Sequence, residues 1–201
     1  MSTIPKTRRV AAYTCAAFLL GAAAWAQTAW TISAGAVTVS CPLTVGGSFE
    51  AKTTALSGRL SADTTQPGRF AGELAVDLAT LDSGIGLRNT HMRENYLEVG
   101  KGEGYQRAVL KDIVLAGDPF GSGATTFTAT LSLHGVERPV RGSARVARAD
   151  GGARVEAAFP VILPDHGIAK PRYLGVGVRD EVQVKVKFQA SAGETAAGSS
   201  R

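Results

Sequence analysis

The sequence predicts an all-β fold of about eight antiparallel strands, with one short helix around residues 86–97. The first observation is that apolar and polar residues alternate along most of the chain, which indicates strands with one buried and one solvated face. The second is that glycine, proline and aspartate separate these runs, as in a sandwich or closed barrel of short strands. The third is that the period changes only once, after Gly86, to a helical spacing.

The alternation is clearest in 182–189, where valine and phenylalanine alternate with glutamine and lysine. In chain order, the expected strands are 36–40, 48–53, 56–61, 73–78, 108–115, 126–134, 140–148, 154–162 and 182–189. Asp150-Gly151 is a hairpin signal between two of them. Pro160 cannot donate a backbone hydrogen bond, so we expect it at an edge or a bulge.

One segment departs from the strand pattern. The positions that follow a helical spacing are Leu87, His91, Met92, Asn95 and Tyr96. A Gly-Ile-Gly breaker at 84–86 precedes them. An isolated helix this short is marginal in water, so it needs tertiary support. Capping the open end of a barrel would supply that support.

The first 26 residues have the pattern of a signal peptide. Three basic residues and no acid precede an apolar run over 10–24. Small residues then supply a cleavage site between Ala26 and Gln27, so we expect a periplasmic or secreted protein. The apolar run is shorter than the roughly 20 residues of a spanning helix, which favours cleavage over anchoring. The pair Arg8-Arg9 leaves Sec and twin-arginine export both open.

Residues 27–190 are expected to form one domain, and the small, polar residues 191–201 a disordered tail. Cleavage removes three basic residues and lowers the net charge from +5 to +2, so the charge gives no support for a nucleic-acid partner. After cleavage Cys41 is the one cysteine, which excludes a disulfide within the chain. We expect Cys41 to be a small buried apolar residue.

The residues offer little for catalysis. The histidines His91, His134 and His166 lack the spacing of a zinc-binding helix. The sequence has no Gly-x-Ser-x-Gly elbow, no complete dinucleotide loop and no haem attachment motif. We therefore expect no catalytic residue, no metal and no cofactor, and explain His134 by turn geometry. The alternative is a periplasmic enzyme that uses Arg88, His91 and Glu94 on a small molecule.

A barrel of about eight strands has room for one small ligand when its inward residues are of modest size. The expected inward faces are rich in valine, leucine, alanine and threonine. Against this, Phe70, Phe127, Phe159 and Phe188 could meet and fill the interior. The residues leave a hollow and a filled barrel both open.

Two ordered motifs resemble a known family. Residues 81–84 (Leu-Asp-Ser-Gly) and 87–99 (beginning Leu-Arg-Asn-Thr-His-Met) resemble the signature of the YceI-like family. Residues 128–140, a strand that ends in His-Gly before Pro-Val, look like its second hallmark. Residues 29–32 and 159–168 fit more loosely. The resemblance extends over nearly the whole mature chain.

The resemblance implies a lipocalin-like barrel, exported to the periplasm, that binds lipid with residues 27–190. Such a protein holds a long-chain polyisoprenoid or isoprenoid quinone non-covalently in an apolar channel, for transport or storage, and catalyses nothing. This chain departs from the family pattern in three places. Asn89 replaces the more usual acid, Tyr96-Leu97 replaces a phenylalanine pair, and 99–105 lacks the expected proline.

The residues expected to contact the ligand come from the helical segment and from inward strand positions. They are Leu87, Arg88, Asn89, His91, Met92, Tyr96, Phe127, Leu131, Phe159, Val184 and Phe188. Arg88, Asn89 and His91 match the family's polar cluster, which would meet a head group or tie the helix to the barrel by hydrogen bonds. A filled-barrel stress or interaction protein is a further alternative. A homodimer and a transient membrane contact stay open.

Overall fold

The computed structural model describes residues 29–33, 35–63, 65–170, 172–173 and 176–193. The predicted signal peptide, 1–26, lies outside the described residues, as does most of the predicted tail. The predicted strands and the residues that resemble the family motifs all lie within the described residues. Among its helices, none combines the length and hydrophobicity that a membrane span requires.

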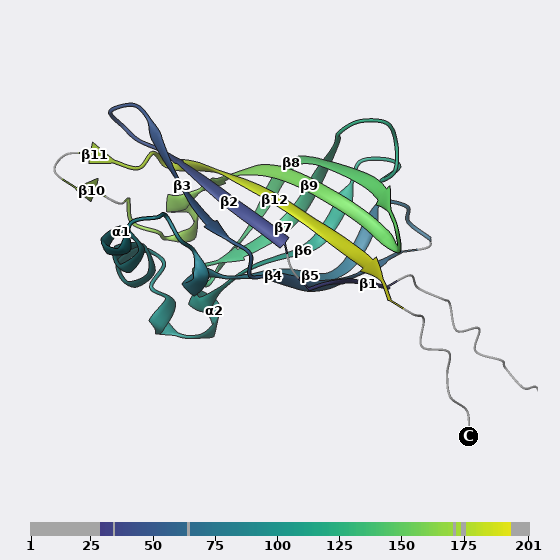
Figure 1. The fold of residues 1–201 in the computed structure, drawn as a ribbon, viewed down its shortest axis with the longest axis horizontal. Helices are drawn as coiled ribbons and strands as arrows, with labels where there is room; N and C mark the ends of the chain where they lie inside the picture. Colours follow the sequence, from purple (N-terminus) through teal and green to yellow (C-terminus); the bar gives the residue numbers. More distant parts are fainter. Residues whose placement is uncertain (1–28, 34, 64, 171, 174–175, 194–201) are drawn as a thin grey trace, which may run out of the picture.

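Eight antiparallel strands close into a barrel (Figure 1). Their order around the ring is β1-β4-β5-β6-β7-β8-β9-β12, and pairing of β1 with β12 closes it. The strands are β1 (Ala29–Ile32), β4 (Leu56–Ala62), β5 (Arg69–Asp77), β6 (Arg107–Leu115), β7 (Thr125–Leu133), β8 (Val136–Ala149), β9 (Gly152–Ile162) and β12 (Glu181–Ala192). The predicted all-β barrel is therefore confirmed.

Two further strands prolong the wall at one end. β2 (Gly35–Pro42) pairs with β12, and β3 (Ser48–Thr53) pairs with β2. Because β1 also pairs with β12 and β4 follows β3, β1 with β2 and β3 with β4 act as two long, interrupted strands. A short pair, β10 (Arg172–Tyr173) and β11 (Val176–Gly177), stands at the same end of the barrel (Figure 1).

The structure corrects the predicted boundaries at both ends of the chain. Strand β1 was not among the predicted strands, because four residues show little alternation, yet it pairs with β4 and β12. Ser191 and Ala192 were expected in the tail, but they belong to β12. They are ordered there because Ser191 pairs with Thr31 and Gly152, and Ala192 with Trp30.

Pro160 lies where β8 and β9 separate. It pairs with Gln183 of β12, whereas the pairing of β8 with β9 ends at Ser143–Ala158. At Pro160, β9 therefore has no hydrogen-bonding partner on its β8 side. The missing amide of proline leaves no bond unmade there, which agrees with the predicted edge position. The 3-10 turn η4 (Leu163–His166) follows and contacts β8.

The segment between β5 and β6 is helical, as predicted. It contains the 3-10 turn η1 (Leu78–Thr80), α1 (Gly86–His91), the π-helical turn η2 (Met92–Tyr96), the 3-10 turn η3 (Val99–Lys101) and α2 (Glu103–Gln106). We call residues 81–97 the lid. None of the residues in α1 or η2 is fully buried, so the lid depends on contacts with the barrel rather than on a core of its own.

Large side chains pack tightly in the half of the barrel where β1 begins and β12 ends. The rings of Phe127 and Phe159 meet edge to face, with centroids 5.9 Å apart. Ile32, Leu115 and Phe188 are also buried, and none of them lines the cavity described below. We call this part the filled half. The other end, under the lid, is the hollow half described below.

Candidate functional site

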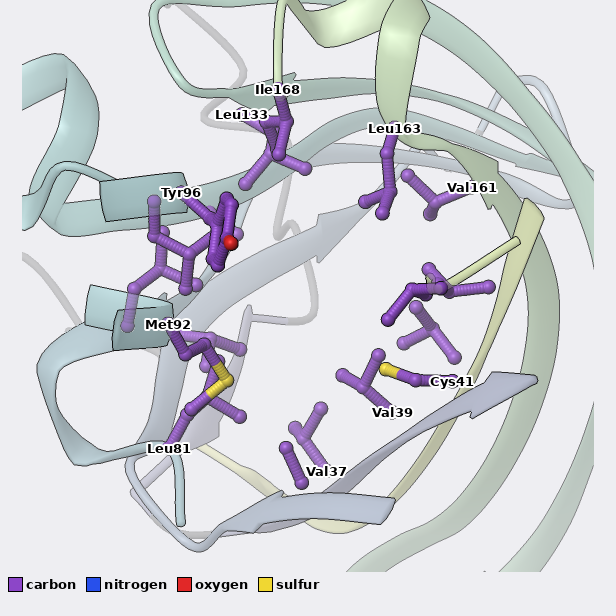
Figure 2. A pocket seen from close by; sticks show the side chains of 18 of the residues that line it. Val37, Val39, Cys41, Leu81, Met92, Tyr96, Leu133, Val161, Leu163 and Ile168 are labelled. Atoms are coloured by element: carbon purple, nitrogen blue, oxygen red, sulfur yellow. The ribbon is translucent and has the colours of Figure 1, made fainter. Parts of the chain in front are cut away.

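The hollow half contains a cavity of about 770 Å³. Its wall is made of inward-facing aliphatic side chains, which Figure 2 shows surrounding an open space. They include Val37, Val39, Leu74, Leu131, Val161 and Val184, from β2, β5, β7, β9 and β12. The volume is within the range of small-molecule sites, roughly 300–1,000 Å³.

The lid covers one side of the cavity. Leu81, Met92 and Tyr96 point from it toward the side chains of β2 (Figure 2). Ile85 and Leu87 reach both the cavity and solvent, because they line its wall and are half or more exposed. The lid therefore forms the mouth of the cavity as well as part of its wall.

A network around Asn89 fixes the start of the lid. Asn89 Oδ1 accepts hydrogen bonds from the backbone and hydroxyl of Ser83, both at 2.8 Å, and Asn89 Nδ2 donates to Asp82 Oδ1 at 2.6 Å. Asp82 exchanges two backbone hydrogen bonds with Lys52 of β3, at 2.8 and 2.9 Å. Farther along, Arg93 Nη2 donates to the carbonyl of Leu81 at 2.7 Å. The side-chain bonds brace the lid internally, and the Asp82–Lys52 pair joins it to β3 of the wall.

Arg88 brings a permanent positive charge to the cavity wall. Its guanidinium lies 4.3 Å from the centre of the Phe49 ring, a cation–π contact. None of the wall residues that the structure describes is a carboxylate. His91, Asn95 and Tyr96 are the polar neighbours of Arg88 on the lid that also line the cavity. The cavity therefore has an apolar interior and a polar region on the lid.

Cys41 is in the cavity wall and is buried, as the sequence predicted. Burial raises the pKa of its thiol to about 11, although the charge of Arg88 opposes this shift. A thiol with that pKa is almost entirely protonated near neutral pH, so it behaves as an apolar wall residue.

A second polar cluster, around Glu98, lies directly after the end of the lid. His134, at the β7–β8 turn, has Nδ1 3.0 Å from the His166 carbonyl oxygen and Nε2 2.9 Å from Glu98 Oε2. Lys101 Nζ lies 2.6 Å from the other oxygen of Glu98. These two partners, Lys101 first, hold the pKa of Glu98 below its usual value. His134 has a φ of 55°, which confirms the predicted turn geometry.

Eight of the predicted contact residues line the cavity. They are Leu87, Arg88, His91, Met92, Tyr96, Leu131, Phe159 and Val184. The other three lie elsewhere. Asn89 is engaged in the hydrogen bonds described above, and Phe127 and Phe188 pack in the filled half. Strand alternation indicates which face of a strand is inward, but it does not indicate how far along the barrel axis the cavity extends.

Sequence reasoning missed much of the wall. Val37, Val39 and Cys41 of β2 line the cavity, and so do Val182 and Val186 on either side of Val184. The same alternation that identified these strands could have identified them, because residues two apart share a face.

The structure does not assemble the residues of the enzyme alternative. Arg88 and His91 line the cavity, whereas Glu94 is exposed and does not. Among the described residues, no three His, Cys, Asp or Glu side chains are grouped as metal ligands.

Comparisons with known proteins agree with this architecture. No curated protein matches the sequence. Among solved structures, a polyisoprenoid binding domain from Saccharophagus degradans, implicated in plant cell wall breakdown, is 18% identical with a TM-score of 0.59, and the match covers 83% of this chain and 99% of that one. Burkholderia cenocepacia BcnA is also 18% identical, with a TM-score of 0.62 and coverage of 77% and 96%. These similarities show the shared fold.

The family comparison is more specific. The model of the YceI-like domain matches residues 30–190, which include every strand except the first residue of β1 and the last two of β12. That range contains both motifs noted in the sequence, the one in the lid and the one at the β7–β8 turn. This chain belongs to the YceI-like domain family.

Proposed function

We propose that this protein binds a long-chain isoprenoid lipid, a polyisoprenoid or an isoprenoid quinone, and transports or stores it without catalysis. The observation that carries the proposal is the aliphatic cavity of about 770 Å³ inside a closed barrel. Each methylene buried there would contribute about 0.8 kcal/mol, so a long hydrocarbon tail binds well with few polar contacts. The polar region of the lid would meet the head group.

The isoprenoid class is supported by family membership and by the fold. The S. degradans domain that shares the fold is described as polyisoprenoid binding. The wall of this cavity consists mostly of valine and leucine. Such a wall suits a flexible, branched hydrocarbon chain, because it makes apolar contacts without requiring one particular conformation. The cavity itself argues against a filled-barrel interaction protein, and the exposed position of Glu94 gives no support to the enzyme alternative.

We also propose that the protein acts in the periplasm after cleavage near Ala26-Gln27. The support is the basic, then apolar, then small-residue pattern of the first 26 residues. Amino-terminal sequencing of the protein recovered from periplasmic and cytoplasmic fractions tests this. A mature protein that retains residues 1–26, or that stays in the cytoplasm, would contradict it. Light scattering of the same sample measures whether the protein is a homodimer.

The lipid itself can be identified by extraction. The purified mature protein is extracted with organic solvent and analysed by mass spectrometry, and the delipidated protein is offered a polyprenol and a quinone. We expect a prenyl lipid in the extract and uptake of at least one of the two. Repeated absence of both would rule out lipid binding.

A matched pair of variants tests whether the cavity is the site. Val39→Trp places an indole ring in the cavity, so it should displace most of the bound lipid. Thr38→Trp, one residue earlier on β2, points to the opposite face and should retain the lipid. Equal lipid content in the two variants would place the ligand somewhere other than the cavity.

A further inference from the structure

The three most exposed large apolar side chains among the described residues lie at one end of the barrel. Val45 is 69% exposed, Leu87 65% and Ile85 50%. Val45 is in the β2–β3 turn, which projects from the same end as α1 (Figure 1). Ile85 and Leu87 also line the cavity, as does Leu43 beside the turn. We call these three exposed side chains (Val45, Ile85 and Leu87) the rim. Ile85 and Leu87 join it directly to the cavity wall, and Val45 is two residues along the chain from the wall residue Leu43.

The backbone of the β2–β3 turn is already hydrogen bonded. Leu43 N donates to Gly47 O at 2.9 Å, Gly46 N to Leu43 O at 3.3 Å, and Thr44 N to Gly177 O at 2.9 Å. Thr44 Oγ1 also accepts from Gly177 N at 3.0 Å. Unpaired amides are costly in an apolar medium. The turn can therefore enter an apolar medium at lower cost, because the amides of Leu43, Thr44 and Gly46 are already paired. The apolar side chain of Val45 lies next to its tip.

The charges near the rim have mixed signs. Arg88 and Arg179 are at this end, and neither is in any of the ion pairs that the described residues form. Arg179 is exposed beside the turn, with Nε 3.4 Å from the Leu43 carbonyl. The exposed acids Asp82 and Glu94 belong to the lid and oppose these arginines. Charge alone would hold an anionic surface weakly, so apolar insertion would have to provide most of any binding.

We propose that the rim docks the open end of the barrel onto the surface of a lipid bilayer, with Val45, Ile85 and Leu87 at the boundary between head groups and acyl chains. Exposed apolar side chains grouped beside a cavity mouth mark such interaction surfaces. The proposal rests on the proposed function, because a lipid that is insoluble in water reaches the cavity from a membrane. In the docked state the lipid passes from bilayer to cavity along Ile85 and Leu87, which are exposed and also line the cavity.

Flotation with vesicles of phosphatidylethanolamine and phosphatidylglycerol tests the docking. Val45→Glu places a charge on the rim, at a position that does not line the cavity. Val114→Glu is the matched control, because Val114 is also an exposed valine, at 37%, but lies on β6 beside the filled half. We expect about tenfold weaker vesicle binding for Val45→Glu, and a change below about twofold for Val114→Glu. Equal binding by both variants would overturn the proposal.

Uptake of the apolar dye N-phenyl-1-naphthylamine from solution separates docking from cavity binding. The wild-type protein and Val45→Glu should take up the dye equally, because the cavity is intact in both. Dye uptake by a wild-type protein that binds no vesicles would overturn docking and leave the proposed function standing. A wild-type protein with no dye uptake and no extractable lipid would overturn the proposed function, and docking with it.

A gain-of-binding variant tests the same contact in the opposite direction, and circular dichroism checks that its fold is kept. Val45→Trp should bind vesicles more tightly than the wild type, because indole favours the membrane interface. Its added fluorescence should be quenched by brominated lipids when vesicles are present. Unquenched fluorescence on bound vesicles would place the turn outside the bilayer and overturn the proposal.

Discussion

The two halves of the barrel share most of their strands but differ in what fills them. On β12, Val182, Val184 and Val186 face the cavity, whereas Phe188 is buried in the filled half. On β7, Leu131 likewise lines the cavity, and farther toward the filled half Phe127 packs against Phe159. Along these shared strands the two halves differ in side-chain volume, and the hollow half also gains part of its wall from β2.

The filled half also uses glycine to make room for its rings. A Cβ atom at Gly142 would lie 2.7 Å from both the Phe127 ring and the Phe159 Cβ, and one at Gly35 would lie 2.8 Å from Phe188 Cβ. Phe159 contributes to both regions, since it lines the cavity and meets the Phe127 ring edge to face. From this difference in packing we expect the filled half to contribute most of the stability of the barrel, whereas the hollow half has space for a ligand.

The largest expected difference between the halves is in the cost of truncating a leucine. Leu115 in the filled half and Leu133 in the cavity wall are each 7% exposed. Leu115→Ala should lower the free energy of unfolding by about 3–5 kcal/mol, because close-packed neighbours lose contacts. Leu133→Ala should cost only about 1–2 kcal/mol in the ligand-free protein, because its side chain already faces open space. Urea unfolding measures the free energy of unfolding of both variants. Equal losses would show that the two halves contribute equally to stability.

A smaller difference is expected from adding a methyl group. Gly142→Ala should cost about 1–3 kcal/mol, because its Cβ overlaps the backbone of β9 as well as the Phe127 ring and the Phe159 Cβ. Gly86→Ala, at the start of α1, meets nothing within 4 Å and should be neutral or stabilising by up to about 1 kcal/mol. Thermal unfolding of the two variants compares them. Destabilisation by Gly86→Ala would show that the lid is packed more tightly than its exposure indicates.

The lid should be sensitive to a change that leaves the filled half unaffected. Asn89→Asp replaces the amide that donates to Asp82 with a second carboxylate, so the two groups repel each other at neutral pH. We expect amide hydrogen exchange in 81–97 to rise about tenfold, with exchange in β7 and β9 unchanged. Acidification toward the pKa of these carboxylates should reverse the effect. Exchange that rises throughout the barrel would mean that the lid and barrel unfold as one unit.

The smallest expected effect concerns the Glu98 cluster. Because its partners lower the pKa of Glu98 in the folded protein, the stabilisation is present above the ordinary carboxyl value of 4.5 and is lost as pH falls through the lowered value. The wild type should therefore lose more stability than Glu98→Gln between about pH 4.5 and pH 3. Unfolding curves at several pH values measure this. Parallel pH profiles would assign the acid sensitivity to other carboxylates.

Much of the fold could be predicted because it depends on local patterns. The alternation in 182–189 and the helical spacing after Gly86 both reflect which face of an element is buried, and that information is contained in neighbouring residues. Strand β1 escaped prediction because four residues give little periodicity, and its stability comes from distant partners on β4 and β12. Its existence depends on tertiary pairing.

The candidate site was predictable in part for the same reason. Inward positions such as Leu131 and Val184 follow from alternation, and the lid residues follow from the motif. The position of the cavity along the barrel axis depends on where large and small side chains from different strands meet. This explains why Phe127 and Phe188 were predicted at the site although they pack in the filled half. It also explains why Val37 and Val39 were overlooked.

The closing pair of the barrel joins the first strand to the last. β1 begins at Ala29 and β12 ends at Ala192, and their two paired positions, Thr31–Ser191 and Trp30–Ala192, complete the ring. The ring therefore cannot close until β12 has been synthesised, and its long-range pairing makes folding slow. Until then β1 and β9 both lack their β12 partner and leave open edges, which could pair with another chain. Closure by the last strand is thus the step that removes these edges.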